Sequence, residues 1–266
     1  MSTNAEAERS LPVALTIAGL DPSGEAGVIA DVGTFSAFAC LPAAAITSLT
    51  FQNASEVFGA EHVAADTVRE QVMAIVAGCK VAGAKTGMLP TRQIVREVAR
   101  LFREADLPAP VVDPVIRSTS GYPLLEADAV EELLRELLPL ARIITPNIPE
   151  AESITGLRVV DEAGMREAAA AIRVLGARAV LIKGGHLGSR AAGGVGEKVR
   201  EAIDVLDDEG SVTIFRGAWV EAGNVRGTGC RLSAAIAAGL ARGMKLEDSV
   251  AEAKRFVGDA ISRWRR

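Results

Sequence analysis

Features that would place this chain of 266 residues in a membrane or outside the cell are absent from its sequence. No apolar run reaches the roughly 18 uninterrupted residues that a membrane-spanning helix requires. Residues 1–10 are polar and lack the cationic start and apolar core of a secretory signal, so we expect a disordered lead-in there. The sequence therefore predicts a cytoplasmic protein.

Cysteine is also scarce, since the chain has only Cys40, Cys79 and Cys230. An odd number of widely spaced cysteines argues against a disulfide framework. No Cys-x-x-Cys pair and no Cys/His spacing typical of a zinc site occurs either. The cysteines therefore predict neither disulfide bonds nor a zinc site.

An excess of positive charge is missing as well. The chain carries 29 Lys and Arg residues against 34 Asp and Glu residues, for a net charge of -5. Such scattered charge has no basic footprint, so nucleic acid is not an expected partner. Aromatic residues make up only 4% of the chain, whereas Ala and Gly are abundant. A core of Val, Ile, Leu and Ala suits helices packed closely on a parallel sheet.

Short apolar runs that suit buried strands alternate with longer amphipathic stretches. The predicted strands are 13–18, 43–51, 82–86, 110–116, 142–145 and 179–183. Apolar residues recur at helical spacing over 94–101, 130–138 and 165–175. Periodicity alone does not separate a buried strand from a buried helix segment. The alternation nevertheless favours βα units around a central, mostly parallel sheet.

The pattern changes near residue 205. Two short runs, 203–206 and 212–215, flank an Asp-Asp-Glu-Gly turn and predict an antiparallel hairpin. Two helices are expected after it, over 231–242 and 247–264, and the Gly-rich stretch 188–196 reads as a flexible surface loop. No repeat or low-complexity linker divides the chain. We therefore predict one α/β domain over residues 11–266.

The most informative segment is Asn-Val-Arg-Gly-Thr-Gly-Cys, which ends at Cys230 and precedes a helix. Gly227 and Gly229 allow a tight turn, and a helix that starts there directs unpaired N–H groups toward an anion. A cysteine at a helix N-terminus is expected to have a lowered pKa. The alternative is a Gly-rich turn before an ordinary helix, with Cys230 as a small buried residue. The sequence lacks both the Walker A pattern and the dinucleotide-binding GxGxxG pattern.

Eight segments in order resemble the ribokinase superfamily, in the branch where Cys replaces the usual Asp base. That branch contains the hydroxymethylpyrimidine/phosphomethylpyrimidine kinases and related bacterial pyridoxal kinases. The matching segments are 14–24, 30–31, 52–53, 85–89, 112–115, 145–151, 183–187 and 227–230. One departure is Arg226, which stands where family members commonly carry His. The resemblance implies a ribokinase-like three-layer sandwich, with a mostly parallel central sheet flanked by helices and a small edge hairpin.

The resemblance also implies the reaction, namely ATP-dependent phosphorylation of 4-amino-5-hydroxymethyl-2-methylpyrimidine and then of its monophosphate, for thiamine biosynthesis. Cys230 would remove the proton, and the turn of Gly227, Thr228 and Gly229 would stabilise the transferring group. The residues implied to bind ATP and Mg²⁺ are Asp113, Asn147, Glu150 and Lys183, with Asp113 and Glu150 on the metal. Without the resemblance, Asp113 reads as a turn residue before Pro, Glu150 as a helix-start carboxylate and Lys183 as a surface lysine.

On the substrate side, the resemblance implicates Gly19, Asp31, Thr50, Gln52, Met88 and Val115. Asp31 and Gln52 would read the ring nitrogens and amino group through hydrogen bonds, and Met88 and Val115 would pack on the flat ring. The alternatives are a solvated helix residue for Asp31, a turn residue for Gln52, and ordinary core residues for the other two.

Three other functions remain open. A pyridoxal kinase shares the same scaffold, although Gln52 and Asn53 favour the pyrimidine. A sugar kinase would normally have Asp at the position of Cys230. Arg226 also leaves open a protein that binds a pyrimidine without phosphorylating it. A homodimer without a membrane or nucleic-acid partner is the family expectation.

Overall fold

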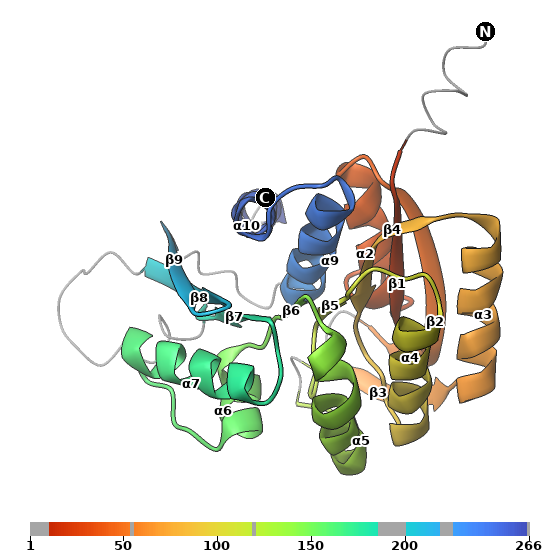
Figure 1. Ribbon diagram of the computed structural model, residues 1–266, viewed down its shortest axis with the longest axis horizontal. Helices are drawn as coiled ribbons and strands as arrows, with labels where there is room; N and C mark the ends of the chain where they lie inside the picture. The colour runs from red at the N-terminus through yellow and green to blue at the C-terminus, as the bar shows by residue number, and fades with distance from the viewer. Residues whose placement is uncertain (1–10, 54–55, 119–120, 186–200, 219–225, 265–266) are drawn as a thin grey trace, which may run out of the picture.

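One sheet of nine strands organises the computed structural model, which describes residues 11–53, 56–118, 121–185, 201–218 and 226–264 (Figure 1). The strands are β1 (Val13–Leu20), β2 (Leu41–Gln52), β3 (Val57–His62), β4 (Val81–Thr86), β5 (Val111–Val112), β6 (Ile143–Ile144), β7 (Ala179–Lys183), β8 (Glu201–Asp208) and β9 (Ser211–Ala218). Their order is β3-β2-β1-β4-β5-β6-β7-β8-β9. In this order, the six strands β2, β1, β4, β5, β6 and β7 run parallel to one another. Strand β3 at one edge, and β8 and β9 at the other, pair antiparallel with their neighbours. The predicted lead-in and the predicted loop over 188–196 lie outside the described residues.

Helices cover both faces of the sheet. They are α2 (Gly27–Ala37), α3 (Ala65–Gly78), α4 (Arg92–Glu104), α5 (Ala127–Glu132), α6 (Ile148–Thr155), α7 (Glu162–Val174), α9 (Thr228–Ala241) and α10 (Leu246–Trp264). One apolar core contains residues from α2, α9 and α10, and the other contains residues from α3 to α7. Figure 1 shows α10 and α7 on opposite sides of the strands from β7 to β9. The three-layer α/β prediction is confirmed.

Alternating side chains explain why the central strands read as continuous apolar runs. Val111 belongs to the core beneath α9, whereas Val112 belongs to the core on the opposite face. Ile143 and Ile144 are divided in the same way. Because successive strand residues point to opposite faces and both faces are covered by helices, neither face needs polar side chains.

Helix α9 lies very close to the middle of the sheet. A Cβ added at Gly83 in β4 would lie 2.5 Å from the backbone oxygen of Ala237 and 2.7 Å from the Cβ of Ala241. A side chain at position 83 would therefore push α9 away from the sheet. The C-terminal half of α9 is therefore held close to β4.

Most predicted elements are confirmed, including the hairpin of β8 and β9 and both C-terminal helices. Strand β5 is shorter than predicted because Pro110 and Pro114 have no N–H to donate to the ladder. The helix expected over 130–138 instead begins as α5 and continues as a π-helix (Leu133–Leu137) and a 3-10 turn (Leu138–Leu140) that contains Pro139. Strand β3 was not predicted.

The parallel strands β1, β4, β5, β6 and β7 all end at the same edge of the sheet. Open α/β sheets bind their ligands in the crevice outside this carboxyl edge. Among the described residues, no helix is both long and apolar enough to span a membrane.

Candidate active site

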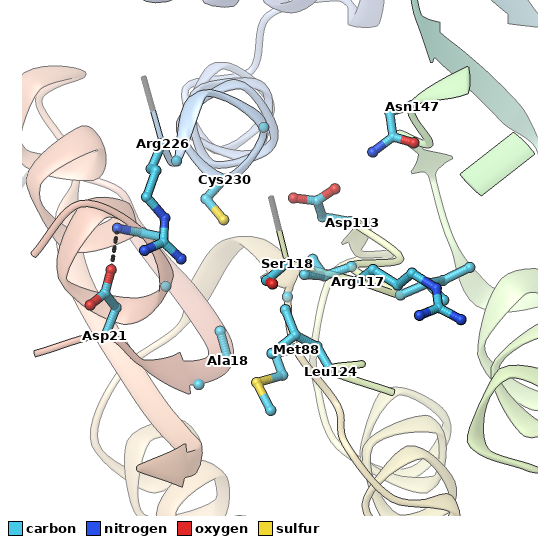
Figure 2. Close-up of a pocket in the computed structure, with 18 of the residues that line it drawn as sticks. Ala18, Asp21, Met88, Asp113, Arg117, Ser118, Leu124, Asn147, Arg226 and Cys230 are labelled. Atoms are coloured by element: carbon cyan, nitrogen blue, oxygen red, sulfur yellow. Dashed lines mark hydrogen bonds between the residues drawn. The ribbon is translucent and has the colours of Figure 1, made fainter. Parts of the chain in front are cut away.

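A cavity of about 660 Å³ lies at the carboxyl edge of the parallel strands. This volume is in the usual range for small-molecule sites. Its lining includes every predicted site residue except Asp31: Gly19, Thr50, Gln52, Met88, Asp113, Val115, Asn147, Glu150, Lys183, Gly227, Thr228, Gly229 and Cys230. In Figure 2, Cys230 lies between Arg226 and Asp113, and Met88 lies across the opening from them. The fold therefore brings segments far apart in the sequence to one cavity.

The glycine turn before α9 has the backbone geometry of an anion site. Gly227 has φ 71°, and a Cβ there would lie 1.8 Å from the Glu25 carbonyl oxygen, so only glycine fits. The first hydrogen bond of α9 runs from the Arg231 N–H to the Gly227 oxygen at 3.0 Å. The preceding N–H groups, of residues 228–230, therefore have no acceptor within the helix. With the positive end of the helix dipole they can stabilise an anion.

Lys183 and Asp113 stand directly beside this turn. Lys183 Nζ lies 3.1 Å from Asp113 Oδ1, and it lies 3.2 Å from the position that a Cβ at Gly229 would take. Burial alone would lower the pKa of Lys183, but the carboxylates of Asp113 and Glu150 raise it above its usual value. Lys183 is therefore an ammonium ion that faces the amides of the turn, and it can neutralise a phosphate held there.

Asn147 and Glu150 form a capping box at the start of α6. The Glu150 N–H donates to Asn147 Oδ1 at 2.9 Å, and the Asn147 N–H donates to Glu150 Oε2 at 2.8 Å. The helix-start interpretation of Glu150 is thus confirmed, while the side chain also lines the cavity. Burial raises the pKa of Glu150, Lys183 opposes this rise, and the Asp113 carboxylate adds to it.

Asp31 is the one predicted site residue that is not among those lining the cavity, because its side chain is fully buried behind the wall. Asp31 is fully buried, and its Oδ2 accepts hydrogen bonds from Lys85 Nζ at 2.6 Å and Thr16 Oγ1 at 2.7 Å. The apolar residues of α2 and β1 pack around it, so a carboxylate there needs a cation. Burial alone would lower the pKa of Lys85, but Asp31 raises it. Asp31 therefore holds Lys85, which is part of the cavity wall.

The expected lowering of the Cys230 pKa is also wrong for this structure. Burial raises the pKa of the Cys230 thiol above its usual value. Lys85 and the Gly27 backbone N–H oppose the rise, whereas the carboxylates of Asp113 and Asp31 add to it. The helix N-terminus is present as predicted, but the partial burial of Cys230 outweighs its effect. Cys230 is thus mainly a thiol at neutral pH.

The remaining substrate-side residues form one wall of the cavity. A Cβ at Gly19 would lie 3.1 Å from Met88 Sδ, so the missing side chain lets Met88 pack close to β1. The Thr50 hydroxyl donates to the Leu20 carbonyl at 2.7 Å, and it therefore fastens the end of β1 to β2. Gln52 and Val115 also line the cavity. Met88 and Val115 give this wall an apolar surface that suits a flat ring.

The cavity wall also contains charged residues that had no predicted role, among them Asp21, Lys85 and Arg226. Asp21 accepts hydrogen bonds from the Ser23 N–H at 2.8 Å and the Ala26 N–H at 3.0 Å, and so shapes the loop that leads into α2. The sequence does contain one sign that Lys85 is special, since it is a charged residue inside the predicted buried strand 82–86. Such a lysine needs a buried partner, but the sequence does not say which carboxylate provides it.

The two predicted metal ligands, Asp113 and Glu150, both line the cavity. Among the described residues, no group of three or more His, Cys, Asp and Glu side chains could hold a metal ion. Asp113 and Glu150 nevertheless face one cavity, and Asp113 raises the pKa of Glu150, so the two charges repel each other. A divalent cation would relieve this repulsion, and Mg²⁺ is usually bound by one or two carboxylates, waters and substrate phosphates. The donor set therefore fits Mg²⁺.

Comparisons with known proteins agree with this geometry. The family model described as phosphomethylpyrimidine kinase matches residues 21–265. A hydroxymethylpyrimidine/phosphomethylpyrimidine kinase of Rhizobium meliloti is 43% identical over 94% of this chain and 90% of its own. The crystal structure of phosphomethylpyrimidine kinase from Clostridium difficile is 36% identical, with a TM-score of 0.80, over 94% of this chain and 99% of that chain.

A pyridoxal kinase is also among the similar structures. The enzyme from Staphylococcus aureus, in complex with AMP-PCP and pyridoxal, is 28% identical, with a TM-score of 0.81, over 95% of this chain and 88% of its own. The family model and the Rhizobium relative each match more than nine-tenths of the chain. The chain therefore belongs to the phosphomethylpyrimidine kinase family.

Proposed function

We propose that this protein transfers the γ-phosphoryl group of ATP to 4-amino-5-hydroxymethyl-2-methylpyrimidine, and then a second phosphoryl group to the monophosphate, for thiamine biosynthesis. The observation that carries the proposal is the convergence of Lys183, Asp113 and the α9 turn on one cavity that also contains Cys230. The names of the relatives support the choice of pyrimidine. The AMP-PCP bound to the Staphylococcus enzyme supports ATP as the donor.

The anion turn and Lys183 would supply most of the catalysis. Phosphoryl transfer requires in-line positioning and stabilisation of charge on the transferring oxygens. Lys183 Nζ lies 3.2 Å from the position that a Cβ at Gly229 would take, so the ammonium stands beside the turn that carries the N–H groups of residues 228–230. A γ-phosphate placed at this point would receive hydrogen bonds and positive charge from two sides.

Cys230 would take the proton in the first step. The substrate hydroxyl oxygen forms a bond to the γ-phosphorus, the bond from phosphorus to the bridging oxygen of ADP breaks, and the hydroxyl proton moves to the Cys230 thiolate. Because burial raises the pKa of Cys230, only a minor thiolate fraction exists at neutral pH. In the second step the attacking phosphate oxygen is already ionised, so a base is less necessary.

Asp113 and Glu150 would hold Mg²⁺, largely through its waters. The ion would neutralise charge on the ATP oxygens. Asp113 is kept in place by hydrogen bonds from Thr145 Oγ1 at 3.4 Å and Ser233 Oγ at 3.3 Å, and Glu150 is kept by its capping box. Two carboxylates fixed in this way would bind the cation without rearrangement of the cavity.

The test is ADP release by the full chain, measured in parallel with the pyrimidine alcohol, its monophosphate and pyridoxal. We expect release with both pyrimidines, and a kcat/KM for the alcohol at least about tenfold above that for pyridoxal. A preference for pyridoxal would make the protein a pyridoxal kinase, the function of the similar Staphylococcus enzyme. Binding of the pyrimidine without ADP release would identify a silent binding protein instead.

The family resemblance also supports a homodimer in the cytoplasm. Light scattering on the purified chain tests the first part, since the chain mass is 27.7 kDa. A mass near that of one chain at micromolar concentration would reject the dimer. Fractionation of cells that produce the protein tests the second part.

A further inference from the structure

Arg226 connects the anion turn to the substrate wall of the cavity. The residue stands immediately before Gly227, is only 7% exposed and lines the cavity. Its Nη1 donates to the backbone carbonyl of Asn53, and its Nη2 donates to Gln52 Oε1 at 3.2 Å. The guanidinium thus holds the end of β2 at two points, and one of them is the side-chain amide of a residue proposed to contact the substrate.

The chemistry of arginine fixes the orientation of the Gln52 amide. A guanidinium has five N–H donors and no acceptor, and it stays charged throughout the accessible pH range. The Gln52 atom that faces the guanidinium must therefore be the oxygen, because the NH₂ group can only donate a hydrogen bond and cannot accept one. No residue that the structure describes accepts a hydrogen bond from Gln52 Nε2. The NH₂ group is consequently left for a ligand.

A histidine in the place of Arg226 would not have this effect. A neutral imidazole has one donor and one acceptor nitrogen, so it can pair with either end of an amide. The Gln52 side-chain amide could then flip by about 180° and present either its oxygen or its NH₂ group to the cavity. Arginine removes this freedom, and its second hydrogen bond, to the Asn53 carbonyl, holds the guanidinium itself in place.

We propose that Arg226 is a positioning residue that orients the Gln52 amide as a donor, so that the site selects a ligand with an acceptor nitrogen in its ring. This inference rests on the proposed function and makes it more specific. An aminopyrimidine offers ring nitrogens that accept and an amino group that donates. With the Gln52 oxygen held toward Arg226, the NH₂ group is the end of the amide that pairs with a ring nitrogen.

The experiment compares the pyrimidine alcohol with its two pyridine analogues, in each of which one ring nitrogen is replaced by C–H. ADP release is measured for the full chain at saturating ATP and Mg²⁺. One analogue should lose at least about tenfold in kcat/KM, because the NH₂ group of Gln52 is left unpaired when it binds. In Arg226→Met, this discrimination should fall below about threefold, and the KM for the alcohol should rise about tenfold with kcat within about twofold.

Two matched variants separate orientation from simple structural damage. Arg226→Lys keeps a donor-only side chain, so it should restore the discrimination that Arg226→Met loses. Gln52→Glu keeps the volume and the contact to Arg226 but has no N–H group, so it should lose discrimination with the KM for ATP unchanged. Circular dichroism confirms that each variant is folded. If Arg226→Met does not fold, the outcome is decided by Gln52→Glu.

Three results would overturn the inference. Full discrimination retained in Arg226→Met would mean that Arg226 does not set the orientation of the amide, and full discrimination retained in Gln52→Glu would mean that the amide does not read the ring. A rise in the KM of the monophosphate alone would mean that the guanidinium binds a phosphate instead. In both cases the wild-type chain still phosphorylates the pyrimidines, so the proposed function stands. Absence of turnover by the wild-type chain would reject the proposed function and this inference together.

Discussion

Two lysine–carboxylate pairs lie at the cavity, one behind its wall and one facing it, and they differ in what surrounds them. Lys85 and Asp31 are 2.6 Å apart, and both side chains are 0% exposed. Lys183 and Asp113 are 3.1 Å apart, and the lysine is 16% exposed toward the cavity. The first pair is closed, because each charge has the other as its main partner in the interior. The second pair is open, because a ligand phosphate can reach the lysine and a cation can reach the carboxylate.

This difference in exposure indicates that the two pairs at the carboxyl edge of the sheet have different roles, the first in stability and the second in ligand binding. A closed pair contributes little to ligand binding, since neither member can leave its partner without exposing an unpaired charge to the apolar interior. An open pair is held weakly enough to reorganise around a ligand. We therefore expect substitutions in the closed pair to affect mainly stability, and substitutions in the open pair to affect mainly turnover.

The largest expected effect is that of Asp31→Asn on stability. The substitution leaves the Lys85 ammonium buried without its counter-charge, and it should lower the free energy of unfolding by about 3–5 kcal/mol. Urea denaturation followed by circular dichroism measures this. Asp113→Asn is the matched control and should cost less, because Lys183 is partly exposed. Equal losses of unfolding free energy from the two substitutions would contradict the distinction between a closed and an open pair.

Next in size is the effect of Lys183→Met on turnover. The variant loses the ammonium that faces the anion turn, and kcat should fall by roughly 100- to 1,000-fold for both phosphorylation steps. The free energy of unfolding should change little, since the lysine is near the cavity surface. The measurement is ADP release at saturating substrates, together with urea denaturation. A stable variant that keeps more than a tenth of the wild-type kcat would contradict the role of the open pair.

Cys230→Ala should separate the two phosphorylation steps. The thiolate is needed only where a hydroxyl must lose its proton, so the first step should slow by about 100-fold and the second by less than about tenfold. Single-turnover assays with the alcohol and with the monophosphate measure each step. Cys230→Ser is a control of similar shape with a much weaker base. Equal losses in both steps would show that the sulfur only shapes the cavity.

The smallest expected effect is on the pH profile of the first step. Burial raises the pKa of Cys230, so below that pKa the thiolate fraction grows about tenfold for each pH unit. The rate of the first step should therefore rise with pH through neutrality, and it should keep rising past pH ~8.5, the ordinary value for a thiol. The second step should depend on pH much less. A plateau of the first step below neutral pH would mean that ligands lower the pKa.

Sequence reasoning predicted most of the fold because the apolar runs and amphipathic stretches are continuous where helices cover both faces of the sheet. It failed at β3, where Gly59 interrupts an edge strand and the Phe58 side chain is 62% exposed. It overestimated the length of β5, because the sequence of an apolar run that contains Pro114 does not show where the backbone hydrogen bonds to the neighbouring strands end. Edge strands and strand ends depend on partners that a local pattern does not reveal.

The site was predicted where residues follow strand ends and carry recognisable motifs, as with Asp113, Asn147 and Lys183. The errors concern partners and environment. The resemblance implicates Asp31 in ligand binding, and a carboxylate on a helix gives no sign in the sequence that Lys85 will be its hydrogen-bond partner. The pKa of Cys230 was predicted from the helix start alone, whereas its direction is set by burial, which depends on the whole cavity.

The close contact between α9 and β4 has a consequence for the order in which the protein becomes functional. Helix α9 follows all nine strands of the described sheet along the chain, yet it covers the central strands β1, β4 and β5 and contributes the turn of the anion site. A ribosome-bound chain that has completed the sheet still lacks that cover, and residues such as Phe35 and Val111 remain open to water or to chaperones. Binding of a phosphorylated ligand can begin only after α9 has emerged and docked, so the ability to bind ATP reports that this helix has packed on the sheet.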